Sequence, residues 1–171
     1  MAVKALTLGE TFEYVSDKDP CKVKQTIQID ENDPSKGVVI DWVIKEGATF
    51  FGLKPLDVFL MGHIYDSANM LTSRQGSDAV DIRTRVNATN IDAVRFGLAY
   101  FRNFQLPNGS DAKVEFVETN INGRDYKAAS DETLKLLGIQ LIQELADEIK
   151  KASEVSKDEE KNSGGPLRRL D

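Results

Sequence analysis

The sequence contains a single cysteine, Cys21, a single histidine, His63, and a single tryptophan, Trp42. One cysteine excludes a disulfide within the chain and any metal site built from several cysteines. No apolar run approaches the roughly 18 residues that a membrane-spanning helix requires, and the first ten residues, which soon become acidic, predict no secretory signal. We therefore expect a water-soluble chain that has no membrane partner.

The sequence also lacks the short motifs that mark common catalytic and nucleotide-binding sites. It has no Gly-x-Ser-x-Gly nucleophile elbow, and although Gly47 and Gly52 have the spacing of a phosphate-binding loop, Leu53 stands where the lysine is required. The segment from Asp30 to Asp33 lacks the ligand spacing, central glycine and distal glutamate of a calcium-binding loop. These absences predict a protein that is not an enzyme and that holds no cofactor or metal.

Two residues keep an enzymatic alternative open. His63 falls on the apolar side of a predicted helix, one turn before Asp66, which can orient a general base or a metal ligand. The same spacing is common on helix surfaces, so we favour a histidine that only packs in the fold. Cys21 follows a proline in a turn, and because no base lies nearby in the sequence, we interpret it as a small packing residue or a surface thiol.

Composition and charge narrow the class of protein further. The chain has 171 residues, of which 40% are hydrophobic, enough for one core. It carries 22 basic and 28 acidic residues, and this net charge of −6 argues against direct nucleic-acid binding, which needs a basic face. We expect a single α+β domain over residues 1–152 and a charged, flexible tail over 153–171, because apolar content falls sharply after Ala152.

Alternating apolar and polar residues predict several strands. A short extended segment is expected near residues 12–15, and the period of two over 21–29 and 38–45 predicts two half-buried strands that pair as an antiparallel hairpin. A further strand is predicted over 80–86. Asn122-Gly123, which joins alternating runs, predicts a tight hairpin because both residues accept a positive φ.

Apolar residues at helical spacing predict the remaining elements. One helix begins near Pro55, and a second runs from the cap residue Thr89 to about Phe104. A third begins after the cap residue Ser130 and is interrupted or bent at Gly138. The whole pattern predicts an α+β fold in which antiparallel strands and hairpins pack with three or four helices.

In the absence of a catalytic pattern, the candidate functional residues are contact residues. Phe50 and Phe51 lie in a predicted loop, where two adjacent phenylalanines do not both point inward easily. Arg74, Arg83 and Arg85 flank and line the strand predicted over 80–86, where they form either a solvated face or a contact with an acidic partner. The tail ends in a segment that either keeps the chain soluble or folds on a partner: Leu167, Arg168, Arg169 and Leu170.

A succession of short segments carries a resemblance to a known group of proteins. It comprises 94–104, the Pro107-Asn108-Gly109 loop, 114–116, the Asn122-Gly123 hairpin, 130–132, 142–149 and 158–162, together with the opening Leu6-Thr7-Leu8-Gly9-Glu10-Thr11 and Tyr14-Val15-Ser16. These segments resemble small, mostly uncharacterised proteins encoded in the structural gene clusters of tailed bacteriophages. Some of those proteins are called tail-assembly or minor structural proteins.

The resemblance implies a non-enzymatic structural protein of the capsid, the head–tail junction or the tail. Such a protein would act through protein–protein contacts in a symmetric assembly, with other phage structural proteins and copies of itself as partners. The expected location is the virion, or the host cytoplasm during assembly. Three alternatives stay open: an assembly chaperone absent from the mature virion, an adaptor that blocks a host protein, and a small hydrolase or metal enzyme using His63.

Overall fold

The fold is α+β, as the sequence predicts, in a computed structural model that describes residues 9–29, 32–72 and 79–154. All strand pairs in the described part are antiparallel. They form a three-stranded sheet in the order β1–β4–β5 and two separate hairpins, β2–β3 and β6–β7. The strands are β1 (Phe12–Tyr14), β2 (Lys22–Gln28), β3 (Val38–Ile44), β4 (Phe50–Leu53), β5 (Leu98–Arg102), β6 (Phe116–Ile121) and β7 (Arg124–Ala129).

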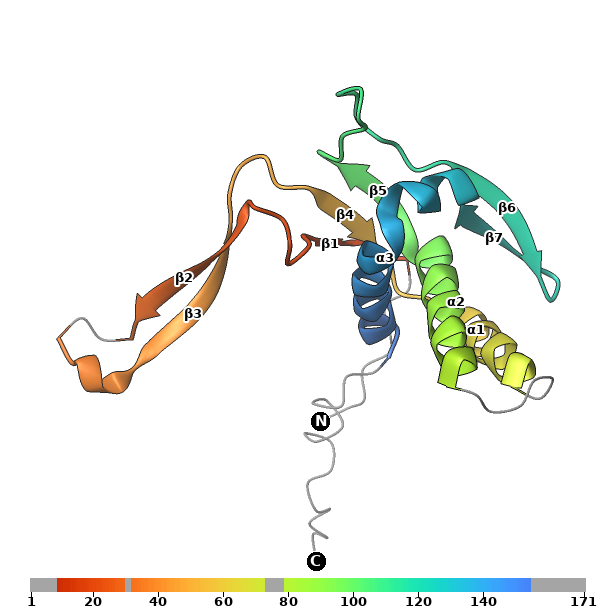
Figure 1. Cartoon of the computed structure of the whole chain (residues 1–171), viewed down its shortest axis with the longest axis horizontal. Coiled ribbons are helices and arrows are strands. Elements are labelled where there is room, and N and C mark those ends of the chain that lie inside the picture. Colours follow the sequence, from red (N-terminus) through yellow and green to blue (C-terminus); the bar gives the residue numbers. More distant parts are fainter. Residues whose placement is uncertain (1–8, 30–31, 73–78, 155–171) are drawn as a thin grey trace, which may run out of the picture.

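Three α-helices in the described residues complete the fold: α1 (Val58–Thr72), α2 (Ala79–Gly97) and α3 (Asp131–Ser153). A short 3-10 helix, Pro34–Lys36, lies between β2 and β3. Figure 1 shows the three helices together with the small sheet and the β6–β7 hairpin, which we call the body. The β2–β3 hairpin, which we call the arm, extends away from the body (Figure 1).

The core lies where the three helices meet β4, β5 and β7. Its largest fully buried side chains include Leu53, Leu56, Ile64, Leu98 and Leu145. At Gly97, the last residue of α2, an added Cβ would lie only 2.6 Å from the Cδ1 atom of Ile149 in α3. The missing side chain therefore lets α2 pack closely against α3.

Local signals explain where α3 begins and bends. The Ser130 hydroxyl accepts a hydrogen bond from the Thr133 N–H at 3.2 Å, and Asp131 and Glu132 occupy the first turn, where the helix dipole favours negative charge. Gly138 has φ 70° and ψ 159°, a backbone conformation that is almost confined to glycine, and it kinks the helix. The predicted cap and the predicted bend are both confirmed.

The Asn122-Gly123 hairpin is also confirmed, with φ values of 51° and 81° at the two turn residues. The predicted strand over 80–86 is wrong, because those residues begin α2. The predicted helix from Thr89 to Phe104 is wrong at both ends: Thr89 lies buried inside α2, and the chain changes to β5 at Leu98. Among the described residues, no helix is long and apolar enough to cross a membrane.

Candidate functional site

Among the described residues, several large exposed apolar side chains gather in the arm. Five large apolar residues between positions 27 and 44 are 44–58% exposed: Ile27, Ile29, Val38, Trp42 and Ile44. An isolated two-stranded hairpin is at best marginally stable in water, since it lacks a covering layer. The arm is therefore the best candidate for a surface that acquires cover from a partner.

The arm differs from the prediction of two half-buried strands in one respect. The pairing register sets Trp42 opposite Lys24 and Val43 opposite Val23. Opposed residues share a face in an antiparallel pair, so the apolar side of β3 lies beside the polar side of β2, and each face of the arm is partly apolar. The predicted strands and their antiparallel pairing are confirmed, whereas the predicted burial is wrong because the body covers neither face.

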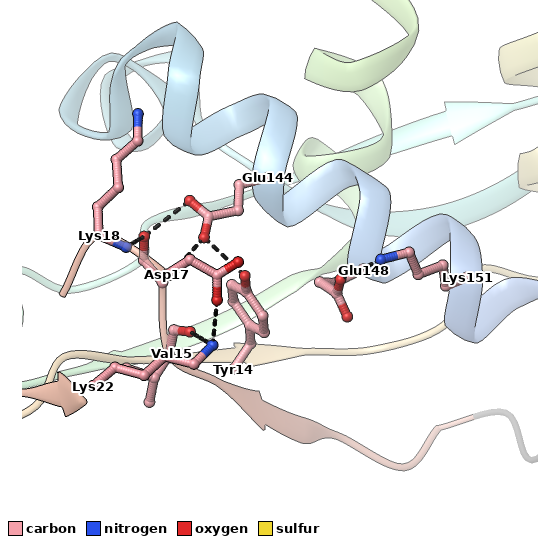
Figure 2. Close-up of polar contacts among 9 residues, drawn as sticks. Tyr14, Val15, Asp17, Lys18, Lys22, Glu144, Glu148 and Lys151 are labelled. Carbon is pink, nitrogen blue, oxygen red and sulfur yellow. Dashed lines mark hydrogen bonds and ion pairs between the residues drawn. The ribbon is translucent and has the colours of Figure 1, made fainter. Parts of the chain in front are cut away.

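A polar cluster fixes the base of the arm to α3, and Figure 2 shows most of its members. The carboxylate of Glu144, in α3, accepts hydrogen bonds from the Tyr14 hydroxyl at 2.8 Å, the Ser16 hydroxyl at 2.8 Å and the Asp17 N–H at 2.7 Å. Tyr14 is the last residue of β1, and Ser16 and Asp17 follow it, where the chain leaves the body for the arm. Charge-assisted hydrogen bonds of this kind are stronger than neutral ones, so Glu144 is the principal anchor.

Lys22, the first residue of β2, joins the same cluster. Its ammonium donates to the carbonyl oxygen of Val15 at 3.0 Å and pairs with the Asp17 carboxylate (Figure 2). It also lies 5.1 Å from the centre of the Tyr14 ring and 5.2 Å from that of Trp42, within range of cation–π attraction. Burial and the neighbouring Glu144 carboxylate raise the pKa of Tyr14, so its hydroxyl stays protonated and donates.

Asp19 ties together the two chain segments at the base of the arm. One of its carboxylate oxygens accepts from the Cys21 N–H and the other from the Thr49 N–H, both at 2.8 Å. Cys21 precedes β2 and Thr49 precedes β4, so this side chain holds the entry and the exit of the arm side by side. The cysteine itself is half-buried, with its sulfur 3.6 Å from the carbonyl oxygen of Glu46.

The phenylalanines proposed as a contact loop lie in a strand instead. Phe50 and Phe51 begin β4, where alternation sends one side chain inward and the other outward. Phe51 is 2% exposed and packs edge-on against Phe101, with ring centres 5.9 Å apart. Phe50 lies beneath the guanidinium of Arg102 at 4.0 Å. The loop prediction is wrong, and Phe51 belongs to the core.

Two of the other predicted contact residues lie outside the arm. Arg83 and Arg85 lie in α2, not in a strand. The remaining ones stay predictions because they lie outside the described residues: Arg74, Leu167, Arg168, Arg169 and Leu170. Two further arginines form ion pairs, Arg95 with Asp131 and Arg102 with Glu13, each at 2.7 Å.

His63 and Asp66 line a cavity of about 510 Å³ between α1 and the β6–β7 hairpin. Arg124 and Tyr126 contribute to the same wall, and the Arg124 guanidinium lies 3.7 Å from the centre of the Phe59 ring. Burial and the nearby Asp57 carboxylate raise the pKa of Tyr126. Within residues 9–29, 32–72 and 79–154, no group of three or more histidine, cysteine or acidic side chains is placed to hold a metal ion.

Comparisons with known proteins leave the geometry as the main guide to function. No family model, no curated protein and no solved structure matches the chain. Sequence reasoning identified the arm as a hairpin but missed its anchor, because Glu144 and Tyr14 are 130 positions apart and no local pattern links them. The fold and the site define an α+β protein with a braced, protruding hairpin.

Proposed function

We propose that this protein is a non-enzymatic structural component of a tailed bacteriophage, which acts through protein–protein contacts in a symmetric assembly. The observation that carries the proposal is the arm: a hairpin with apolar side chains exposed on both faces and a base braced by Glu144 and Lys22. Bracing restricts the arm before it binds, so less conformational entropy is lost on binding. This restriction is useful when an exposed element must be presented to a partner at a defined angle. The phage setting rests on the resemblance of the sequence segments described above.

The arm favours a contact role because it contributes little to the core. Among residues whose burial is described, the buried apolar cluster draws nearly all its members from β4, α1, α2, β5, β7 and α3, and it includes no residue of β2 or β3. An element that adds little to folding but exposes large apolar side chains typically marks an interaction surface. Other structural proteins of the particle and further copies of this chain are the proposed partners, in the virion or in the host cytoplasm during assembly.

Shortening the arm tests this proposal. A variant in which residues 24–42 are replaced by Asn-Gly keeps the base and closes the remaining ends with a favoured turn. We expect the body to unfold at a similar temperature, while the variant fails to enter particles made in an infected host. The control is Thr26→Ser, which changes an exposed arm residue conservatively. Normal incorporation of the shortened variant would contradict the proposal.

Mass spectrometry of purified particles separates the two assembly roles. Presence of the chain in stoichiometric amounts supports a structural component of the virion. Its absence from mature particles, combined with failed assembly of the shortened variant, supports the alternative of an assembly chaperone. A particle that assembles normally without the chain would contradict both roles and would favour an adaptor that acts on a host protein.

The second candidate is a small hydrolase that uses His63. The observation in its favour is that His63, Asp66, Arg124 and Tyr126 line one cavity. We expect His63→Ala to leave particle yield and infectivity unchanged, since the proposed function does not involve that side chain. A variant that is folded and incorporated but loses infectivity would favour the enzyme.

A further inference from the structure

We propose that β3 pairs edge to edge with β3 of a second copy of this chain, so that two arms form one four-stranded antiparallel sheet. The inference rests on the proposed function, because it names the partner of the same arm. It begins from a mismatch between sequence and position. Six of the seven residues of β3 are apolar, Val-Val-Ile-Asp-Trp-Val-Ile, a run that is typical of a strand inside a sheet. In the described structure, however, β3 has β2 on one side only.

The hydrogen-bonding pattern shows which backbone groups of β3 face the open edge. The Lys45 N–H donates to the Cys21 carbonyl at one end of the arm, and the Ile29 N–H donates to the Gly37 carbonyl at the other. Bonded residues alternate along an antiparallel strand, so the odd-numbered positions of β3 bond to β2. The N–H and C=O groups of the even-numbered positions, among them Trp42 and Ile44, point to the outer edge. Such an edge is a template for another strand.

Charge selects one register for a symmetric β3–β3 pair. If Val43 lies opposite its own copy at the two-fold axis, Asp41 lies opposite Lys45 of the second copy, and the pair occurs twice. Centring the axis on Asp41 would set two carboxylates against each other, and centring it on Trp42 would leave Asp41 opposite Val43. Opposite charges across strands stabilise a sheet and like charges destabilise it. Asp41 and Lys45 are both exposed and accessible for this contact.

The same register completes apolar rows on both faces of the combined sheet. Because Val23 is opposite Val43 in the arm, four valines form a continuous row across the four strands. On the other face, Trp42 of each copy lies opposite Ile44 of the other copy, which gives two adjacent Trp–Ile pairs. Trp42 and Ile44 are 44% and 46% exposed in the single chain, so this pairing supplies cover that the body does not.

In the single chain, Asp41 makes a hydrogen bond that the pairing would replace with the contact to Lys45. Its Oδ1 atom accepts a hydrogen bond from the Trp42 N–H at 2.8 Å, which occupies one donor of the open edge in the single chain. In the proposed dimer, the Trp42 N–H donates to the Ile44 carbonyl of the second copy, and the Asp41 carboxylate turns to Lys45. The Trp42 N–H and the Asp41 carboxylate therefore each have a partner in the single chain and in the dimer, so neither group loses a hydrogen bond on pairing.

A charge exchange tests the register. In sedimentation equilibrium, Asp41→Lys and Lys45→Asp should each weaken self-association roughly tenfold or more, because two attractive pairs become two repulsive ones. The double variant Asp41→Lys with Lys45→Asp should recover most of the loss, since the pairs return with reversed sign. Asp41→Asn is the control for the loss of charge alone, and it should fall between the wild type and the single reversals. Equal association of all four variants and the wild type would overturn the register.

A disulfide tests the axis independently. Val43 occupies a position that does not bond across the new edge, where opposed Cβ atoms approach to about 5 Å. In a Cys21→Ser background, Val43→Cys should oxidise to a covalent dimer, whereas Thr26→Cys on the far strand of the arm should stay largely monomeric. Absence of a Val43→Cys dimer, together with a wild-type chain that is monomeric at every concentration, would overturn the pairing. The proposed function is tested separately by the variant that lacks residues 24–42. If the pairing is overturned but this variant still fails to enter particles, the proposed function stands and the arm binds a different chain.

Discussion

In the body, Leu145 and Ile149 of α3 are completely buried, whereas in the arm Trp42 and Ile44 of β3 keep almost half of their surface exposed. Both regions are built from regular, well-paired elements with many apolar residues. They differ in cover: α3 packs against α2, while the arm has solvent on both faces. Secondary structure and burial are therefore separate properties. Apolar side chains of the same kind stabilise the fold in the body and are available to a partner in the arm.

The largest expected effect comes from a cavity in the body. Leu145→Ala removes a fully buried side chain and should lower the free energy of unfolding by about 2–5 kcal/mol. Ile44→Ser is the matched change in the arm, and at concentrations where the chain is monomeric it should cost less than about 1 kcal/mol. Urea denaturation measures both. Equal losses would show that the arm is part of the cooperative core and would remove the distinction.

A smaller effect is expected at the kink of α3. Gly138→Ala places a side chain at φ 70° and ψ 159°, and should cost about 1–3 kcal/mol through backbone strain alone. No atom lies within 4 Å of the added Cβ, so steric overlap does not contribute. The control is Leu136→Ala, which removes a 42% exposed side chain two residues away. A thermal melt in which Gly138→Ala is as stable as the wild type would mean that α3 straightens without loss.

Weakening the anchor should affect the arm more than the body. Glu144→Gln replaces a carboxylate that accepts three hydrogen bonds, and should cost about 1 kcal/mol in global stability. Hydrogen exchange of the arm amides should accelerate, because the base of the arm is freed while the core is intact. Glu148→Gln, one turn further along α3, is the control, since the Glu148 carboxylate pairs with Lys151. Identical exchange in both variants would remove the anchoring role.

The smallest effect is expected at the start of α3, where Arg95 holds the pKa of Asp131 below its ordinary value of 3.8. A lowered pKa in the folded state stabilises the protein above the pKa of the unfolded chain, and this contribution is lost as pH falls through the folded value. Asp131→Asn should therefore lower the melting temperature slightly at neutral pH, and the difference should vanish in strong acid. A difference that persists in strong acid would assign the effect to the helix cap instead.

The sequence predicts those parts of the fold that local chemistry determines. Asn122-Gly123 accepts two positive φ values, Ser130 caps a helix, and Gly138 breaks one, so each signal lies within a few residues of its effect. The strand predicted over 80–86 is wrong, although apolar and polar residues alternate there. These residues begin α2, and the later half of that helix packs in the core and stabilises it. Tertiary contacts override such short-range preferences.

The site was predictable only in part, for the same reason. The period of two over the arm revealed its strands and their pairing, but whether anything covers a strand depends on segments far away in the sequence. Ile91, Val94, Leu98 and Phe101 keep helical spacing across the true end of α2, so the sequence does not reveal β5, the strand that pairs with Phe50 and Phe51. The Glu144 anchor depends on the kinked path of α3 and could not be read from spacing.

Lys22 gives the arm a preferred direction. Its single ammonium contacts the Trp42 ring on the arm as well as the carbonyl of Val15 and the carboxylate of Asp17 at the base. Swinging the arm would break these contacts together, so the angle between hairpin and helices is held by several bonds at once. In any array in which chains contact one another through their arms, that angle is repeated at every contact. One side chain thereby helps to set the curvature of a structure many times larger than the chain.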